Sequence, residues 1–413
     1  MPLAVEKDRL YLHRYWFYEN RLAMQIKAMI KLGYSFEKLE ALLDKYFSLG
    51  VDGTDWQREA AKMAINQSFS IITDGPGTGK TTTVVKILAL LQELAEQPLH
   101  IALAAPTGKA AMRLQESIGF NNAALPCPEI IKTLITETVT TLHRLLGAKP
   151  PSPYFRHDAA KPLVYDLVVV DEASMVDLAL MSKLLDALKP GSRLILLGDK
   201  DQLASVESGA VLADLTMALP EHTLELKKSH RFDDSMKRLA MAVNLQQEDA
   251  AWQILREGNE NIAMLEQDLI DYVAAQQTDY LRLIKAGAGF DEIYRAFSRF
   301  QVLCSNREGK NSVSDINYRV EQRLFGQKLI NLPGLWYPGR PVMVTQNNSA
   351  LHLYNGDIGI CMPDKDQNGK FMVFFQRADG SVKKYLPGRL SLCETVFAMT
   401  IHTKARAPSL KRW

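Results

Sequence analysis

The feature that most constrains the fold of this chain is a glycine-rich turn that follows a short apolar run and opens an amphipathic stretch. The turn reads Thr73-Asp74-Gly75-Pro76-Gly77-Thr78-Gly79-Lys80-Thr81. Its glycines let backbone N–H groups approach phosphates closely, and the Lys and hydroxyl after them can meet the β/γ-phosphates and a Mg²⁺ ion. Between a strand and a helix, such a turn predicts a nucleotide-binding P-loop, with Lys80 on the phosphates and Thr81 on the metal.

One position departs from the strict P-loop pattern. The pattern places Gly six residues before the Lys, where this chain has Asp74. Asp adopts unusual backbone angles more readily than most residues, but its carboxylate would lie near the phosphates. Since the rest of the loop is intact, we predict that Asp74 alters the affinity for nucleotide and leaves the site in place. A purely structural glycine-rich turn is the alternative.

Four continuous apolar runs lie in the first half of the chain, at 70–73, 101–105, 167–170 and 194–198. They alternate with amphipathic sequence typical of helices. Strands that are apolar throughout are buried on both faces, which is typical of a parallel sheet with helices on both sides. The sequence therefore predicts an α/β fold.

The segments outside these runs differ in character. Two helices are expected near the N-terminus, the first over about 9–31 and the second capped by Ser35. The first carries an aromatic stripe, which either packs on the neighbouring domain or forms a surface for a partner protein. Residues 235–298 read as mostly helical, with one helix expected over 268–285. Residues 338–397 read as short strands, at 341–345, 358–362, 371–375 and 381–385, joined by turns, which suggests a small β-barrel.

Composition excludes several classes of protein. The 413 residues are 47% hydrophobic and 23% charged, with a net charge of only +2, as in a globular protein with more than one core. The four cysteines form no CxxC pair, so a zinc ribbon is not expected. No apolar run reaches the ~18 residues that a membrane span needs, and the N-terminus does not resemble a signal peptide. We therefore expect a cytoplasmic protein with no membrane partner.

Two acidic residues and an amide follow the later apolar runs. Asp171 and Glu172 come directly after the run at 167–170, where one carboxylate can hold Mg²⁺ and the other can polarise a water molecule. Gln202 follows the run at 194–198 and could bridge a γ-phosphate and that water. An acidic pair that caps the next helix and a polar turn are the alternatives. Their positions after buried strands, downstream of a P-loop, favour the catalytic interpretation.

Five further motifs accompany these residues, in the order found in superfamily-one DNA helicases. They read APTGKAA (105–111), TLHRLLG (141–147), SHRF (229–232), NGDIG (355–359) and AMTIH (398–402). Together with the P-loop and the acidic pair, they closely resemble the RecD family, the alpha subunits of bacterial exodeoxyribonuclease V (RecBCD). The resemblance runs from about residue 10 to His402 and so covers nearly the whole chain.

The resemblance implies an ATP-dependent 5′→3′ DNA helicase or translocase that acts in double-strand-break repair and recombination. It implies ATP and Mg²⁺ as cofactors, single-stranded DNA and duplex ends as ligands, and RecB- and RecC-like subunits as partners. The implied domains are a helical remnant of a partner-binding domain at 1–50, a P-loop RecA-like parallel-sheet domain at 51–234, the start of a second, incomplete RecA-like domain at 235–337 and an SH3-like barrel insertion at 338–397.

The family's motifs also imply roles for single residues. Gln57 matches the glutamine that reads adenine, Gln202 the γ-phosphate sensor, and Arg231 an arginine that stabilises transition-state charge. The implied catalytic residues are Lys80, Asp171, Glu172, Gln202 and Arg231, and the implied metal ligands are Thr81 and Asp171. The implied nucleotide-binding residues are Gln57, Gly75, Pro76, Gly77, Thr78, Gly79, Lys80, Thr81 and Thr82. The implied contacts to single-stranded DNA are Thr107, Lys109, Thr141 and His143. Taken alone, His143 could equally be a core histidine.

The last residues depart from the family. After AMTxH the family continues with Lys-Ser-Gln-Gly-Ser-Glu-Phe and a final motif with an ATP-contacting arginine, whereas residues 403–413 here read TKARAPSLKRW. With suitable codons, a one-base shift of the reading frame restores the family's sequence, so a frameshift that truncates the chain is one expectation for 398–413. A natural basic tail that binds nucleic acid is the other. A truncated chain would bind nucleotide with little DNA-stimulated turnover and no unwinding.

Overall fold

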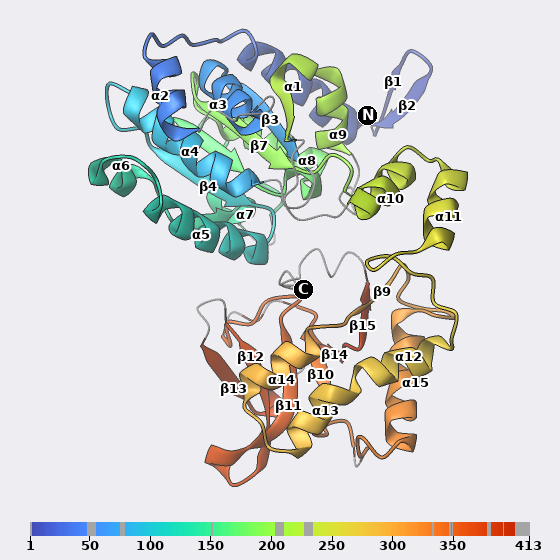
Figure 1. Ribbon diagram of the computed structural model, residues 1–413. Coiled ribbons are helices and arrows are strands. Elements are labelled where there is room, and N and C mark those ends of the chain that lie inside the picture. Colours follow the sequence, from blue (N-terminus) through green and yellow to red (C-terminus); the bar gives the residue numbers. More distant parts are fainter. Residues whose placement is uncertain are drawn as a thin grey trace. The chain divides into compact units, whose positions relative to one another are not determined.

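The computed structural model describes residues 2–47, 55–74, 79–149, 152–202, 210–226, 234–332, 334–346, 348, 350–377, 381–390 and 392–400. The chain divides into two compact units, Met1–Ile254 and Leu255–Trp413. Figure 1 labels the elements of both units. Each unit has its own hydrophobic core and is described by itself.

The first unit is built on a six-stranded sheet in which all neighbouring strands are parallel. Across the sheet the order is β5 (Val139–Thr141), β4 (Ile101–Ala105), β6 (Leu167–Val170), β7 (Arg193–Gly198), β3 (Phe69–Asp74) and β8 (Thr223–Leu226). The four apolar runs form β3, β4, β6 and β7, which confirms the α/β fold expected from the sequence.

Helices cover both faces of this sheet (Figure 1). Successive residues of one strand point to opposite faces, and Val169 and Val168 of β6 accordingly lie in two different cores. One face packs against α2 (Leu39–Tyr46), α3 (Trp56–Asn66), α4 (Lys80–Leu94) and α5 (Gly108–Ala123). The other packs against α1 (His13–Met29), α7 (Leu142–Leu145), α8 (Leu178–Ala187) and α9 (Val211–Ala218). Burial on both faces explains why the strands are apolar throughout.

The unit also contains shorter or peripheral elements. They are α6 (Glu129–Leu134), α10 (Asp234–Asn244), α11 (Glu248–Glu257), η1 (Ala173–Met175) and η2 (Pro220–His222).

The N-terminal segment differs from the expected helix. Residues Leu3–Glu6 (β1) and Arg9–Leu12 (β2) form an antiparallel hairpin, and α1 begins only at His13. The helix expected over 9–31 is therefore wrong at its start, because pairing with β1 provides partners for the backbone of β2. Lys7, at φ 52°, supplies the left-handed residue of the turn. Ser35 does not cap α2 either, since α2 starts at Leu39 with no side-chain cap.

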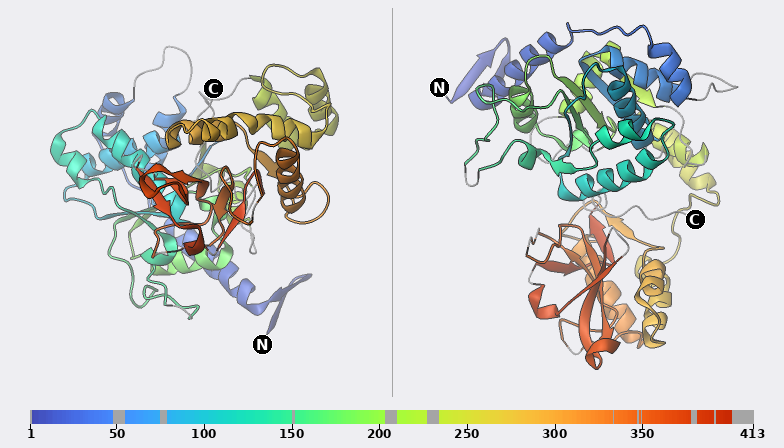
Figure 2. Two further views of the ribbon diagram at one scale, coloured as in Figure 1. Left: turned by 90° about the horizontal axis from the view of Figure 1, so that it is seen from below. Right: turned by 90° about the vertical axis from the view of Figure 1, so that its left-hand side faces the viewer.

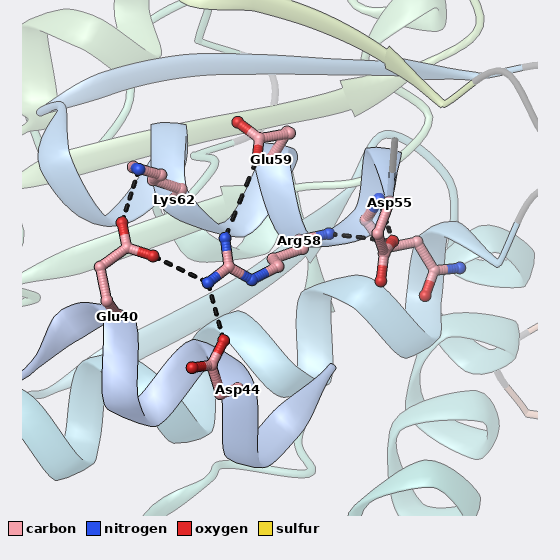
Figure 3. A network of polar contacts seen from close by, with 7 residues as sticks. Glu40, Asp44, Asp55, Arg58, Glu59 and Lys62 are labelled. Atoms are coloured by element: carbon pink, nitrogen blue, oxygen red, sulfur yellow. Dashed lines mark hydrogen bonds and ion pairs between the residues drawn. The ribbon is translucent and has the colours of Figure 1, made fainter. Parts of the chain in front are cut away.

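A polar network joins α2 to the start of α3 (Figure 3). The Arg58 guanidinium donates to Glu40 and Asp44 at 2.7 and 2.8 Å. Lys62, one turn further along α3, pairs with Glu40 at 2.5 Å. The Asp55 carboxylate caps α3 by accepting hydrogen bonds from the backbone N–H groups of Gln57 and Arg58, at 3.0 and 3.2 Å. These contacts fix the first turn of α3, which carries Gln57.

Replacing Asp55 by Ala is expected to lower the free energy of unfolding by about 1 kcal/mol. Two N–H groups at the start of α3 would lose their acceptor. Urea-induced unfolding followed by circular dichroism measures the change. Asp55→Ser is the matched control, because its hydroxyl can still accept, and it should unfold at nearly the same urea concentration as the parent. Equal loss in both variants would show that the cap itself does not stabilise the helix.

In the residues that the structure describes, the second unit combines four helices with two sheets, and Figure 2 shows it from two further sides. The helices are α12 (Leu269–Gln276), α13 (Thr278–Lys285), α14 (Phe290–Phe297) and α15 (Val313–Gly326). The single helix expected over 268–285 is two helices, which meet at Gln277. A short parallel pair consists of β9 (Val302–Cys304) and β15 (Ala398–Thr400).

The larger sheet of this unit is antiparallel. Its order is β13 (Val382–Tyr385), β12 (Lys370–Gln376), β11 (Ile358–Asp364), β10 (Pro341–Val344) and β14 (Cys393–Thr395), with η3 (Lys365–Gln367) and η4 (Pro387–Arg389) between strands. Four of these strands were expected from the sequence, and β14 was not. One face, including Ile360 and Phe374, packs on the helices, and the other, including Cys361 and Phe375, encloses a smaller core. An SH3-like closure of this sheet stays a prediction.

Among the described residues, no helix is both long and apolar enough to cross a membrane. The four cysteines are free thiols.

Candidate functional site

The parallel sheet brings two separate motifs together at the carboxyl ends of its strands. β3 and β6 both pair with β7 in parallel, so Lys80, which follows β3, and the acidic pair after β6 lie at the same edge. Lys80, the first residue of α4, places its Nζ 3.8 Å from Oδ1 of Asp171. Both side chains are largely shielded from solvent, with 16% and 12% exposed. The structure thus joins the residues that the sequence analysis assigned to phosphate and metal.

Gly79 is the residue on which this approach depends. Its φ of 87° lies in the left-handed region, which favours glycine. A Cβ built at this position would come within 2.5 Å of Nε2 of Gln57. Gln57 from α3 therefore lies directly against the start of α4, and its adenine-reading role stays a prediction.

The acidic pair sits in a constrained turn after β6. The Asp171 N–H donates to the carbonyl of Ala104 on the neighbouring strand, at 2.9 Å. The Glu172 N–H donates to Oδ1 of Asp171, also at 2.9 Å. Glu172 itself has φ 53° and ψ 39°, a left-handed conformation that costs a non-glycine residue about 1 kcal/mol or more. These two hydrogen bonds hold the turn and so fix the positions of the two carboxylates relative to each other.

A basic residue that the sequence analysis missed faces this turn. Arg113, on the second turn of α5, has a buried Nη2 atom with no hydrogen-bond partner. Burial lowers the pKa of the Arg113 guanidinium, and the nearby carboxylates of Glu172 and Glu116 act in the opposite direction. Arg113 lies four residues after Lys109, which places both on one side of the helix. Arg113 itself lies two residues beyond the motif at 105–111, and nothing in that motif singled it out.

The threonines after Lys80 differ in what they contact. The Thr82 hydroxyl donates to Oδ1 of Asn121 on α5 at 2.9 Å, and the Thr83 hydroxyl donates to the carbonyl of Gly79 at 3.1 Å. Thr81, assigned to the metal, is partly exposed at the same helix start. The hydroxyl of Thr82, which was expected to bind nucleotide, is thus engaged in a hydrogen bond with α5.

Gln202 lies four residues beyond the end of β7 and is exposed. Its backbone N–H donates to the carbonyl of Asp199 at 3.3 Å. The preceding Lys200 pairs with Glu225 of β8 at 2.9 Å, which ties this turn to the sheet. Because β7 pairs in parallel with β6, the turn after β7 lies at the same edge of the sheet as the acidic pair.

The expected DNA contacts occupy two adjacent helix starts. β4 and β5 pair in parallel, so α5 and α7, which follow them, begin side by side. The hydroxyls of Thr107 and Thr141 cap these helices by accepting from the N–H groups of Ala110 and Arg144, at 3.2 and 3.3 Å. Each hydroxyl proton stays available to donate elsewhere. Lys109 is partly buried on α5.

His143 is exposed on α7, and its ring centroid lies 5.8 Å from that of Phe155. The alternative that His143 is a core histidine is wrong.

Several assigned positions lie outside the described residues. They are Gly75, Pro76, Gly77, Thr78, Arg231 and the segment from 401 to 413, which includes the proposed frameshift. The backbone of Asp74 ends β3, and its side chain is likewise outside the description.

Comparisons with known proteins agree with this geometry. A family model described as an AAA domain matches residues 57–208. The RecBCD enzyme subunit RecD of Mycolicibacterium smegmatis is 42% identical over 404 residues, which cover 96% of this chain and 71% of that protein. The Haemophilus influenzae RecBCD enzyme subunit RecD is 35% identical, covering 97% and 71%. The ATP-dependent RecD2 DNA helicase of Deinococcus radiodurans is 33% identical, covering 80% and 41%.

Proposed function

This chain belongs to the RecD family of RecBCD enzyme subunits, and on that premise we propose that it is an ATP-dependent DNA helicase subunit of a RecBCD-type exodeoxyribonuclease V. The observation that carries this proposal is the approach of Lys80 to Asp171 beside Gly79 and Gln57. It brings the Lys80 ammonium, the Asp171 carboxylate and the Gln57 amide around one small volume, which supports the proposed roles of these residues.

The residues fit a nucleotide with Mg²⁺. In this proposal Lys80 holds the β/γ-phosphates, and Thr81 and Asp171 hold the ion, whose role is to neutralise charge that develops on the phosphates. Glu172 accepts a proton from the attacking water, and the constrained turn keeps its carboxylate in place for that step. Gln202 contacts the γ-phosphate, and Arg231 supplies positive charge in the transition state.

We further propose that single-stranded DNA crosses the starts of α5 and α7. The free hydroxyl protons of Thr107 and Thr141, with Lys109, would donate to backbone phosphates, and the exposed His143 ring would contact a base. Movement is 5′→3′, from duplex ends, in double-strand-break repair in the cytoplasm. RecB- and RecC-like subunits are the proposed partners, since the relatives are named as RecBCD subunits.

The domain assignment follows from the same proposal. Residues 51–234 would form the first RecA-like motor domain, residues 235–337 the start of the second, and residues 338–397 an SH3-like insertion that contacts DNA. The six-stranded parallel sheet and the separate antiparallel sheet support the first and the last of these.

Two measurements test the function. ATP turnover is measured with and without single-stranded DNA, and strand separation is measured on duplexes with a 5′ or a 3′ tail. DNA-stimulated turnover and preference for the 5′ tail are expected. Preference for the 3′ tail would contradict the direction. Nucleotide binding without DNA stimulation would support the alternative stated from the sequence, a protein that binds nucleotide only.

Replacing Arg113 by Gln is expected to lower ATP turnover by about ten-fold, as loss of roughly 1.4 kcal/mol of favourable charge interaction does. The guanidinium is the positive charge that interacts with the Glu172 and Glu116 carboxylates. Arg113→Lys keeps the charge and should retain most of the turnover, which phosphate release measures in both variants. An equal loss of turnover in the two variants would assign Arg113 to packing alone.

A further inference from the structure

A cavity lies in the first unit, and neither Lys80 nor Asp171 is among its lining residues. It has a volume of about 650 Å³ and forms where the start of α1, the segment at 154–160 and α8 meet. Cavities of this size hold small ligands or single nucleotides. None of the residues assigned from the sequence to nucleotide, metal or DNA line it.

Aromatic rings form much of the lining. Tyr154 and Phe17 are 74% and 44% exposed, which is unusual for such large side chains in a concave surface. The Lys183 ammonium lies 5.7 Å from the ring centroid of Tyr18 and 5.4 Å from that of Phe155. It also donates to the carbonyl of Pro153 at 2.9 Å, so its position is fixed. The cavity therefore presents aromatic ring faces beside the positive charge of Lys183, whose position is fixed.

The lining carries three permanently charged cations, Arg14, Arg21 and Lys183, against two carboxylates. Both carboxylates are engaged within the protein. Asp186 accepts from Arg21 and Gln25, each at 2.5 Å. Asp158 accepts from the backbone N–H groups of Ala160 and Lys161, each at 3.0 Å. Arg14 and Lys183 are the remaining cations of the lining. An anionic ligand with a planar group suits this combination.

The cavity adjoins the proposed path of DNA. Phe155 lines it and also contacts the His143 ring, at 5.8 Å between centroids. A DNA strand that passes His143 would therefore lie next to Phe155, which lines the cavity.

We propose that this cavity binds a nucleotide of single-stranded DNA, with its base on Tyr154 or Phe17 and its phosphate near Lys183 and Arg14. The inference rests on the proposed function, because it extends the DNA path beyond His143. Stacking and phosphate contacts of this kind tolerate any base sequence, so the cavity would hold the strand without reading it.

Photocrosslinking of the full chain to an oligonucleotide that contains 5-iodouracil tests the location. Crosslinked peptides from the segment at 154–160 are expected. In parallel, fluorescence anisotropy measures the affinity for oligo-dT. Tyr154→Ala should weaken it by about ten-fold, whereas Tyr154→Phe, which keeps the ring, should not. Arg14→Gln should lower the slope of log affinity against log salt by about 0.7, as loss of one phosphate contact does.

The matched control is Phe120→Ala, which removes an equally exposed ring on α5, 81% exposed and outside the cavity. Its affinity should match that of the parent. Tyr154 is largely exposed, so its truncation leaves the core intact, which thermal unfolding verifies. Crosslinks confined to 105–111 and 141–147, with parent-like affinity of Tyr154→Ala for oligo-dT, would reject DNA binding in the cavity but leave the proposed function intact. Absence of DNA binding in every variant would overturn both. Loss of partner-subunit binding with intact DNA affinity would assign the cavity to a protein.

Discussion

The Lys80→Gln variant is expected to lose essentially all ATP turnover, by a factor of about 10³, and to bind nucleotide more weakly than the parent. Lys80 is the only described cation placed at the start of α4, and its Nζ lies 3.8 Å from the Asp171 carboxylate. Gln has a similar length but no charge, so the phosphates would lose their counter-charge without a large change in shape. Turnover is followed by phosphate release, and nucleotide affinity by a fluorescent ATP analogue.

The control for this variant is Lys62→Gln, which removes a lysine from the exposed side of α3 and breaks a surface pair with Glu40. Such pairs contribute between about 0 and 1 kcal/mol, so turnover and affinity should stay at parent levels. Turnover in Lys80→Gln equal to that of the control would reject the nucleotide site. Loss of affinity in both variants would point to a general loss of fold.

The Glu172→Gln variant is expected to turn over ATP about 10³-fold more slowly while it binds nucleotide as tightly as the parent. The amide keeps the size of the carboxylate and the backbone conformation at φ 53°, but it cannot accept a proton from water. The loss should therefore fall on the chemical step alone. Single-turnover hydrolysis, measured together with nucleotide affinity, separates the two effects.

Glu116→Gln is the matched control, because Glu116 and Glu172 both act on Arg113. If the slower ATP hydrolysis came from the loss of a carboxylate that neutralises Arg113, Glu172→Gln and Glu116→Gln would slow hydrolysis alike. If Glu172 activates the water, only its replacement slows hydrolysis. A parallel fall in affinity and turnover in Glu172→Gln would instead give the residue a structural role.

The parallel sheet and the approach of Lys80 to Asp171 could be predicted because their signals are local. A strand buried on both faces must be apolar throughout, and the residues after such strands meet at one edge. Lys80 and Asp171 are 91 positions apart in the sequence, yet this rule alone brings them together. Gln57 needed the family resemblance, since nothing in its own sequence context indicates that it lies against Gly79.

The errors arose where tertiary contacts decided the local structure. Residues 9–12 carry apolar and aromatic side chains that suit a helix or a strand equally, and pairing with 3–6 selected the strand. The sequence pattern of residues 268–285 is that of one continuous helix, but the backbone forms two helices, because Gln277 ends one and precedes the next. Arg113 could not be assigned because burial of one guanidinium nitrogen is not visible in a sequence.

The turn at Glu172 sets stability against activity. A Gly or Asn at this position would adopt φ 53° more readily, and the protein would gain up to about 1 kcal/mol of folding free energy. The gain would remove the carboxylate that the proposed chemistry needs. Selection for stability alone would therefore favour another residue here, and the unfavourable backbone conformation of Glu172 supports its proposed role in the chemistry.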